Sequence, residues 1–350
     1  MNTLYFAYPG ELETPTGGYG YDRKIIAGLE DLGWQVELVP LGAGFPFPAA
    51  ETLSQAQTVL EGLPAGAQLV VDGLAFGVMP EAASLACGRL DLVALVHHPL
   101  CRETGLSEDE ASGLFESERN ALGHARHVIV TSHATATQVA DLFGVAEERI
   151  TIVLPGTEKQ DFAARGSSGK LKLLSVGTVV RRKGYDLLFA ALDGLRECDW
   201  HLDIVGGLDA DPGCHAALLQ QLSGLGLTDR VTFKGAVAPQ DLSGFYRQAD
   251  VFVLASRYEG YGMAYTEALA HGLPVIGSGG GAVADTLPDG AAIYCGTEDT
   301  GKLRSALKLL MTNESKRLDM SAAARRAAEA LPDWRDAAAQ FAVALGGVRR

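Results

Sequence analysis

Residues 251–276, VFVLASRYEGYGMAYTEALAHGLPVI, combine a buried strand, a glycine-containing loop and the start of a helix. The unbroken apolar run Val251–Ala255 predicts a strand of a parallel sheet. Gly260 and Gly262 follow the strand and permit both a tight turn and a close approach of a ligand to the backbone. We expect a helix over Met263–His271, because a Gly-Leu-Pro segment directly after it stops the helical pattern.

The N-terminus of that helix is a predicted anion site. The first backbone N–H groups of a helix are unpaired and the helix dipole is positive there, so we expect phosphate oxygens on the amides of Gly262, Met263 and Ala264. Glu259 lies in the loop beside this site. Glu267 lies just over one turn into the helix, where its carboxylate could accept two hydrogen bonds from a vicinal diol such as that of a ribose.

The segment EGYGMAYTEALAHGLPVI resembles the Glu-x7-Glu signature of retaining glycosyltransferases with the GT-B fold, family 4 in particular, which belong to glycosyl transferases group 1. The resemblance implies an α/β protein with two Rossmann-like, doubly wound domains facing across a cleft. A generic α/β connection with two solvated glutamates is the alternative. It does not explain why both acids and both glycines fall at the carboxyl end of a strand, where open α/β sheets bind ligands.

Alternating strand and helix patterns predict a doubly wound parallel sheet in each half of the chain. The expected strands are Leu4–Tyr8, Gln35–Val39, Gln68–Asp72, Leu92–Val96, Val128–Thr131 and Ile150–Leu154, then Leu171–Val176, His201–Val205, Val231–Phe233, Val251–Ala255 and Pro274–Ile276. We expect domains at 1–160 and 170–325 joined by the linker Lys159–Gly169. Helical segments at about 299–312 and 314–346 end the chain, and in the family the last helix, here within 326–350, crosses back to the first domain.

The net charge of −14 limits the class of partner. Residues 1–160 hold 21 acidic and 8 basic side chains, a balance of −13, whereas residues 161–350 hold 22 and 21, a balance of −1. Such a field repels nucleic acid and disfavours an anionic membrane surface. We therefore expect no nucleic-acid partner, and the acidic first half slightly favours a soluble acceptor over a lipid.

Cysteine usage and apolar runs indicate the compartment. The five cysteines are scattered without a C-x-x-C pair, which argues against a zinc site or a disulfide framework and fits a reducing environment. The stretch MNTLYFAYPGELET lacks the basic flank and apolar core of a signal peptide, and no run approaches the ~20 apolar residues of a membrane span. We expect a cytoplasmic protein without a transmembrane segment.

Two stretches of the first half resemble family motifs. The strand Leu92–Val96 ends in His97 and His98, and the family usually has a histidine there that contacts the transferred sugar; the register favours His97. TGGYGYD follows the first strand and resembles the family's glycine loop, which faces the donor, with Gly18 as the candidate contact. A plain tight turn is the alternative. A dinucleotide fingerprint fails here, because Arg23 stands at the third glycine position.

The basic run in SVGTVVRRKGYDLL resembles the family's Arg/Lys pair, which neutralises the donor diphosphate. Lys183, followed by glycine, matches the lysine. Thr178 stands where many relatives carry the arginine, so the resemblance points to Arg182 or Arg181 as its substitute. A solvated basic face is the alternative.

The resemblance implies transfer of a sugar from a nucleoside diphosphate sugar to an acceptor with retention of configuration. Glu259 and His97 are then the catalytic candidates, Glu259 positioning sugar hydroxyls rather than acting as a nucleophile. The donor candidates are Arg182, Lys183, Gly262, Met263, Ala264, Glu267 and Gly18, with no metal and no cofactor required. The sequence leaves open the sugar, the base, the acceptor and two alternatives: another GT-B enzyme, such as a nucleotide-sugar epimerase or a phosphorylase, and a non-catalytic nucleotide-sugar binder.

Overall fold

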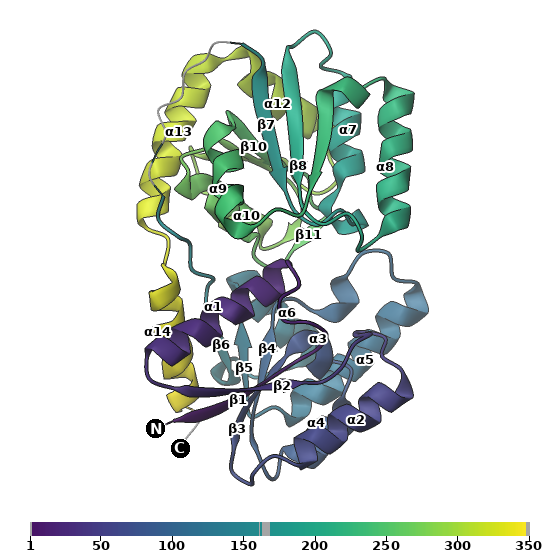
Figure 1. The fold of residues 1–350 in the computed structure, drawn as a ribbon, viewed down its shortest axis with the longest axis vertical. Coiled ribbons are helices and arrows are strands. Elements are labelled where there is room, and N and C mark those ends of the chain that lie inside the picture. The colour runs from purple at the N-terminus through teal and green to yellow at the C-terminus, as the bar shows by residue number, and fades with distance from the viewer. Residues whose placement is uncertain (1, 161, 163–168, 348–350) are drawn as a thin grey trace. The chain divides into compact units, whose positions relative to one another are not determined.

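The computed structural model describes residues 2–160, 162 and 169–347, which form two compact units (Figure 1). Unit 1 comprises Met1–Gly156 together with Pro332–Arg350, and unit 2 comprises Thr157–Leu331. Unit 2 is therefore inserted into the chain of unit 1. The predicted linker Lys159–Gly169 falls largely outside the described residues. Among the described helices, none combines the length and the apolar composition that crossing a bilayer requires.

Unit 1 is built on a parallel six-stranded sheet in the order β2-β1-β3-β4-β5-β6. Its strands are β1 (Thr3–Tyr8), β2 (Gln35–Pro40), β3 (Gln68–Asp72), β4 (Asp91–Val96), β5 (His127–Val130) and β6 (Ile150–Ile152). Its helices are α1 (Gly17–Asp31), α2 (Ala50–Glu61), α3 (Gly73–Phe76), α4 (Pro80–Ala86), α5 (Glu108–His124), α6 (His133–Phe143) and α14 (Trp334–Gly347), with 3₁₀ turns at η1 (Leu100–Arg102) and η2 (Glu147–Arg149).

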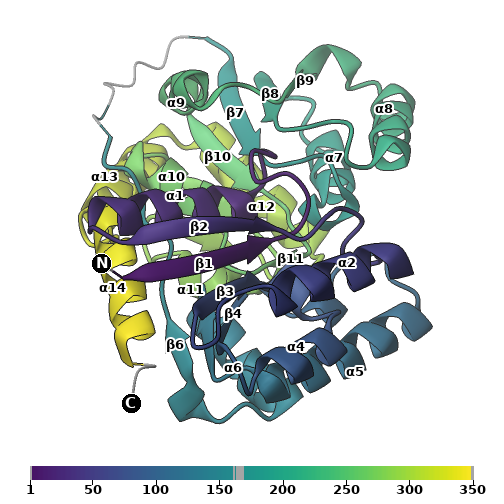
Figure 2. The ribbon, with the colours of Figure 1, turned by 60° about the horizontal axis from the view of Figure 1, so that its bottom comes forward.

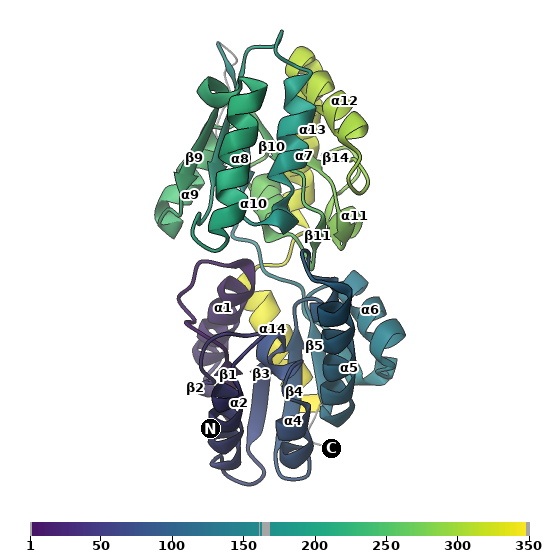
Figure 3. The same cartoon turned by 90° about the vertical axis from the view of Figure 1, so that its right-hand side faces the viewer.

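Alternation along these strands gives unit 1 a core on each face of the sheet. Leu4 and Phe6 of β1 face α1 and α14, whereas Ala7 faces the side covered by α2 to α6. Helix α14 lies beside α1 in both Figure 2 and Figure 3, and Phe341 at its centre is fully buried. The last helix of the chain is thus part of the core of unit 1.

Unit 2 repeats the architecture with the sheet order β14-β12-β10-β7-β8-β9. Its strands are β7 (Leu171–Val176), β8 (Trp200–Val205), β9 (Val231–Gly235), β10 (Val251–Leu254), β12 (Val275–Gly277) and β14 (Ala292–Tyr294), with a small pair β11 (Tyr258–Glu259) and β13 (Gly280–Gly281). Its helices are α7 (Tyr185–Asp193), α8 (Pro212–Leu225), α9 (Pro239–Gln248), α10 (Met263–Ala270), α11 (Val283–Thr286), α12 (Thr300–Thr312) and α13 (Glu314–Glu329), with 3₁₀ turns at η3 (Arg181–Lys183) and η4 (Thr228–Arg230). Helices α7, α8 and α12 cover one face, and α9, α10 and α13 the other (Figure 1).

Each sheet reverses its strand order at one point. In unit 1 the reversal lies between β1 and β3, and in unit 2 it lies between β7 and β10. Connections that leave two neighbouring strands in opposite directions open a crevice at the carboxyl ends, where doubly wound sheets bind ligands. These two positions therefore indicate where functional side chains should be sought in each unit.

Two expectations about the elements need correction, and one strand was missed. The glycines of TGGYGYD do not form a loop, because α1 begins at Gly17 and the Thr16 side chain caps it by accepting from the Tyr19 amide. The segment predicted as one helix over 314–346 divides into α13 and α14 around Pro332, whose ring cannot continue an α-helix. Strand β14 was not predicted, since it is only three residues long and half-exposed.

Substituting Phe341→Ala should lower the free energy of unfolding by about 3–5 kcal/mol, because it removes a buried ring and leaves a cavity between α14, α1 and the sheet. Urea unfolding followed by circular dichroism measures the effect. The control is Val343→Ala on the same helix, where the side chain is 75% exposed and a change within about 0.5 kcal/mol is expected. Equal effects of the two substitutions would contradict a core role for α14.

Candidate functional site

A buried carboxylate marks the point where the sheet of unit 2 reverses. Glu259 at the end of β11 is 5% exposed, and three side chains hold it. Lys183 Nζ lies 2.6 Å from Oε1, and the Ser256 hydroxyl donates to the same oxygen at 2.5 Å. Arg182 Nη1 lies 3.2 Å from Oε2 and also donates to the Tyr258 carbonyl. The loops after β7 and β10 thus meet in one ion-pair cluster.

The charges of this cluster fix the protonation of Glu259. Burial by itself would raise the pKa of its carboxyl, but the adjacent Lys183 and Arg182 outweigh burial and lower the pKa to about 2. The group is therefore ionised at neutral pH. It can accept hydrogen bonds and balance positive charge, but it has no proton to donate.

Close backbone packing brings the two loops together. Gly184 after η3 has φ +62°, and a Cβ there would lie 1.9 Å from the Ala255 carbonyl oxygen, so only glycine permits this approach. Arg257 then bridges the loops, with Nη1 and Nη2 at 2.8 and 2.7 Å from the Asp186 carboxylate. The same guanidinium donates to the Arg181 carbonyl at 2.8 Å. Arg257 therefore ties η3, which carries Lys183, to the segment that carries Glu259.

The N-terminus of α10 lies directly beside this cluster. A Cβ on Gly262 would lie 3.8 Å from Glu259 Cβ. Gly262 is the N-cap residue with φ +94°, and within the described residues no side chain caps the helix. Gly262, Met263 and Ala264 are all half-exposed. The first amides of α10 are thus placed to meet an anion at the edge that Lys183 also faces.

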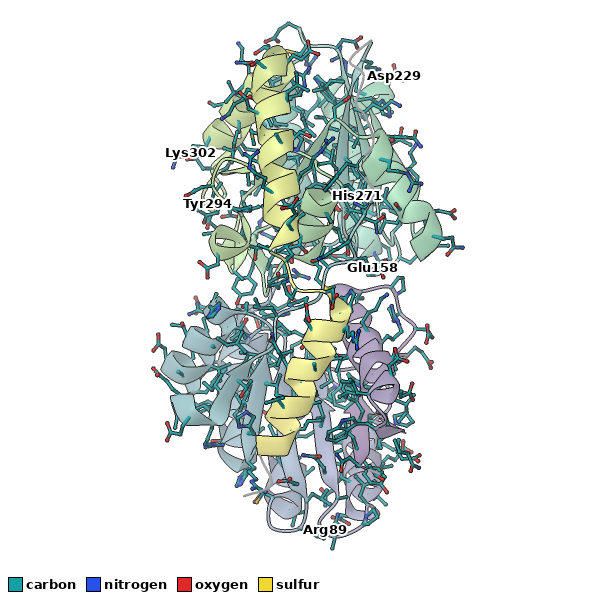
Figure 4. All side chains as sticks on the ribbon, turned by 90° about the vertical axis from the view of Figure 1, so that its left-hand side faces the viewer. Arg89, Glu158, Asp229, His271, Tyr294 and Lys302 are labelled. Carbon is teal, nitrogen blue, oxygen red and sulfur yellow. The ribbon has the colours of Figure 1, made fainter. Side chains whose placement is uncertain are left out.

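Glu267 is held within α10 by an aromatic neighbour. The Tyr246 hydroxyl donates to Glu267 Oε2 at 2.7 Å, and the Tyr246 ring stacks on His271 with centroids 4.8 Å apart. His271, labelled in Figure 4, is the C-cap residue of α10. Burial raises the pKa of Glu267 above its ordinary value, and the Tyr246 hydrogen bond opposes that rise. One carboxylate oxygen is thus anchored while the other remains available.

A second cluster lies at the reversal point of unit 1. His97 Nε2 lies 3.2 Å from Asp22 Oδ1 and 3.3 Å from Asp72 Oδ2. Asp72 ends β3, His97 follows β4, and Asp22 projects from α1. A Cβ on Gly18 would lie 3.4 Å from the His97 ring, so the first turn of α1 packs directly on the imidazole. His98 is turned to a different partner, Glu103, at 3.4 Å.

The acids reverse the effect of burial on His97. Burial alone would lower the pKa of the imidazole, but Asp22 and Asp72 raise the pKa to about 10. Burial also raises the pKa of Asp22 to about 7, against the lowering effect of His97. His97 is therefore protonated at neutral pH, which gives a positive charge within an acidic unit.

Two groups of acids bear on metal binding. Asp22, Asp72 and His97 bring three potential ligand atoms within 4.8 Å of one another, but Nε2 of the imidazole already lies at hydrogen-bonding distance from both carboxylates. The sequence contains the Asp-x-Asp triplet Asp209–Ala210–Asp211 before α8, which the expectation of a metal-independent reaction overlooked. Asp211 Oδ1 accepts from the Cys214 amide at 2.9 Å as the N-cap of that helix. We therefore assign neither group to a metal.

The sequence-based candidates fall into two groups. Lys183, Arg182, Glu259, Gly262, Met263, Ala264 and Glu267 lie together in unit 2, and His97 and Gly18 lie together in unit 1. Of the two arginines considered, Arg182 reaches Glu259, whereas Arg181 lines a separate cavity of about 330 Å³ between α7 and α8. Sequence reasoning missed the supporting residues Asp22, Asp72, Ser256 and Tyr246. Asp72 carried a signal, since it is an acid at the carboxyl end of an apolar strand.

The lowered pKa of Glu259 predicts how stability depends on pH. Since its folded-state pKa of about 2 lies below the ordinary 4.5, the ionised group stabilises the fold by about 3 kcal/mol above pH 4.5. We expect Glu259→Gln to lower the free energy of unfolding by that amount at pH 7. The difference in this free energy between variant and wild type should narrow as pH falls from 4.5 toward 2. Urea unfolding at several pH values measures both. Glu298→Gln, which removes an exposed partner of Arg257, should cost less than about 1 kcal/mol. A gap independent of pH would contradict the ion-pair assignment.

Comparison with known proteins places this geometry in a family. Residues 157–327 match the family model Glycosyl transferases group 1. The MMP alpha-(1->4)-mannosyltransferase of Mycolicibacterium hassiacum is 26% identical over 85% of this chain and 74% of its own length. The mannosylfructose-phosphate synthase of Agrobacterium fabrum is 34% identical over 48% and 43%, and the D-inositol 3-phosphate glycosyltransferase of Kineococcus radiotolerans is 29% identical over 68% and 62%.

Solved structures agree on the fold. Sucrose-phosphate synthase from Thermosynechococcus elongatus superposes with a TM-score of 0.84 over 99% of both chains at 20% identity. Anabaena HepE in complex with UDP and glucose gives a TM-score of 0.75 over 97% of this chain and 99% of its own at 18% identity. Residues 157–327, which include Lys183, Glu259 and Glu267, therefore belong to glycosyl transferases group 1, and the chain is a glycosyltransferase with the GT-B fold.

Proposed function

We propose that the protein transfers a sugar from a nucleoside diphosphate sugar to an acceptor hydroxyl with retention of the anomeric configuration. The observation that carries this proposal is the ionised Glu259, held by Lys183 and Arg182 beside the uncapped N-terminus of α10. A diphosphate leaving group gains negative charge as its bond to the sugar breaks. Preorganised cations and backbone amides are the groups that stabilise such charge.

The proposed roles in unit 2 follow from the charge of each group. Lys183 and Arg182 bind the diphosphate while they remain in contact with Glu259, and the amides of Gly262, Met263 and Ala264 take further phosphate oxygens. The Glu259 carboxylate accepts hydrogen bonds from the sugar hydroxyls. Both of its oxygens are engaged by cations, so it positions the sugar and is not a free nucleophile.

Glu267 is the proposed partner of the nucleoside. The Tyr246 hydroxyl donates a hydrogen bond to Oε2 of its carboxylate. This hydrogen bond fixes the side chain and thereby the direction of Oε1. A carboxylate one turn inside a helix whose N-terminus binds phosphate is well placed to accept from a ribose diol. This role would help to recognise any ribonucleoside and does not select the base.

His97 and Gly18 are the proposed contributions of unit 1. Since His97 is protonated at neutral pH, it can donate a hydrogen bond to a sugar hydroxyl and thereby orient the sugar. A Cβ at Gly18 would lie 3.4 Å from the His97 ring, so this glycine lies directly beside the imidazole.

For the acceptor we propose a small soluble molecule with a free hydroxyl. Three similar proteins carry a phosphorylated sugar or polyol in their names: mannosylfructose-phosphate synthase, D-inositol 3-phosphate glycosyltransferase and sucrose-phosphate synthase. The acidic balance of residues 1–160 disfavours docking on an anionic membrane. We further propose a cytoplasmic location, for which the scattered cysteines and a nucleotide-sugar donor are the arguments.

The direct test is calorimetric binding of UDP, GDP and ADP, followed by an acceptor screen with the sugar donor of the nucleotide that binds. Proton NMR of the product then reports the anomeric configuration. Transfer with retention supports the proposal. Donor turnover without an acceptor would instead identify a nucleotide-sugar epimerase, and donor binding without any turnover would identify a non-catalytic binder.

Glu267→Ala should weaken nucleotide affinity by about 10- to 100-fold, which corresponds to ~1–3 kcal/mol for a hydrogen bond to a charged group. Calorimetry on the folded variant measures this change. The control is Glu329→Ala, an exposed glutamate at the end of α13, for which affinity should stay within about twofold. Unchanged nucleotide affinity in Glu267→Ala would refute the ribose assignment.

Removal of metal should leave transfer intact, because Lys183, Arg182 and the α10 amides supply the positive charge that a metal ion supplies elsewhere. We expect the rate in excess EDTA to stay within about twofold of the untreated rate, whereas Lys183→Met should lower kcat by about 10²- to 10³-fold. Loss of activity in EDTA that added Mn²⁺ restores would contradict this mechanism. The triplet that ends in Asp211 would then be the first place to examine.

A further inference from the structure

His97 is fixed at both ends by other parts of unit 1. Its ring nitrogen Nε2 faces two carboxylates, Asp22 at 3.2 Å and Asp72 at 3.3 Å. Its backbone carbonyl accepts from the hydroxyls of Thr131 at 3.2 Å and Thr135 at 3.3 Å. Four side chains, from α1, β3, α6 and the loop after β5, therefore converge on one residue.

The two acids are themselves withdrawn from water. The Asp22 and Asp72 side chains are 0% and 3% exposed, while the His97 side chain is 19% exposed. Asp72 Oδ1 also accepts from the Leu74 amide, and Asp22 Oδ2 has no hydrogen-bond partner within the described part of the chain. Buried carboxylates need a positive partner. Among the described residues no lysine or arginine pairs with either acid. His97 is therefore the residue that can supply positive charge to both of them.

Other titratable groups around the cluster are tyrosines of α1. The Tyr21 ring packs edge-on against the His97 ring with centroids 5.5 Å apart, and burial raises its pKa above the ordinary value. Burial, and then Asp72 and Asp22, raise the pKa of Tyr19 to about 12. Both tyrosines are therefore neutral near pH 7, and the charge of the cluster is set by the two acids and His97.

We propose that Asp22 and Asp72 are positioning residues that keep His97 as a fixed imidazolium, so that it serves sugar transfer as a cation and hydrogen-bond donor and not as a base. This inference rests on the proposed function. An imidazolium has protons on both ring nitrogens and no lone pair with which to remove a proton. When the acceptor oxygen bonds to the anomeric carbon and the bond to the diphosphate breaks, the acceptor proton therefore leaves with the phosphate oxygen.

The test is NMR titration of the whole protein labelled in its histidine rings, with His97 assigned by comparison with His97→Gln. We expect the wild-type His97 to remain protonated through pH 8. The substitutions Asp22→Asn and Asp72→Asn keep shape and, for Asp72, the cap on α3. Each should lower the pKa of His97 by about 1 to 3. Asp91→Asn, at the other end of β4 and paired with Arg126, is the matched control and should leave it unchanged.

Kinetics give a second readout. In Asp72→Asn we expect kcat to fall by about 10-fold or more about one pH unit above the lowered pKa of His97, where the ring is largely neutral, with recovery toward wild type at pH 6. A purely structural role would lower the rate equally at both pH values. A wild-type His97 that titrates near 6.5, a pKa unmoved by either substitution, or a ring signal displaced by stoichiometric Zn²⁺ would each overturn the inference. Because the titration needs no substrate, its outcome is independent of whether sugar transfer is found.

Discussion

The pairing of Glu259 with Lys183 and Arg182 is the interaction on which the ligand edge of unit 2 depends. It joins the loop after β7 to the loop after β10, the two strands between which the sheet order reverses. None of these charges could be buried alone without a cost of several kcal/mol. Gly184 permits the close approach of the two loops, and the hydrogen bonds of Arg257 hold the loops together. The positions of these strands, of their loops and of the first turn of α10 therefore depend on one another.

In each unit a cluster of charged side chains lies where the strand order of the sheet reverses, and the two clusters have opposite balances of charge. Unit 2 places two cations against one carboxylate, whereas unit 1 places two carboxylates against one imidazole. Unit 2 is thus suited to attract a polyanion, and unit 1 is not. The uneven distribution of charge along the sequence, −13 before residue 161 and −1 after it, has this local counterpart in the two clusters.

Much of the fold could be predicted, since buried parallel strands leave long apolar runs such as Val251–Leu254. Short or half-exposed elements such as β14 left no comparable pattern. The residues of the unit 2 site were predicted because they follow one another in two short segments. The acids that surround His97 were not, because Asp22 and Asp72 come from distant parts of the sequence and meet only when the sheet forms.

The insertion of unit 2 before α14 sets an order for the growing chain. During synthesis the strands of unit 1 and helix α1 emerge first, yet the apolar face formed by Ile25, Leu29 and their neighbours stays uncovered until α14 arrives. All of unit 2 is made in between, as one contiguous segment that can complete its own sheet. Unit 1, whose strands leave the ribosome first, therefore completes its core last. It must remain soluble with an exposed apolar face until α14 has been synthesised.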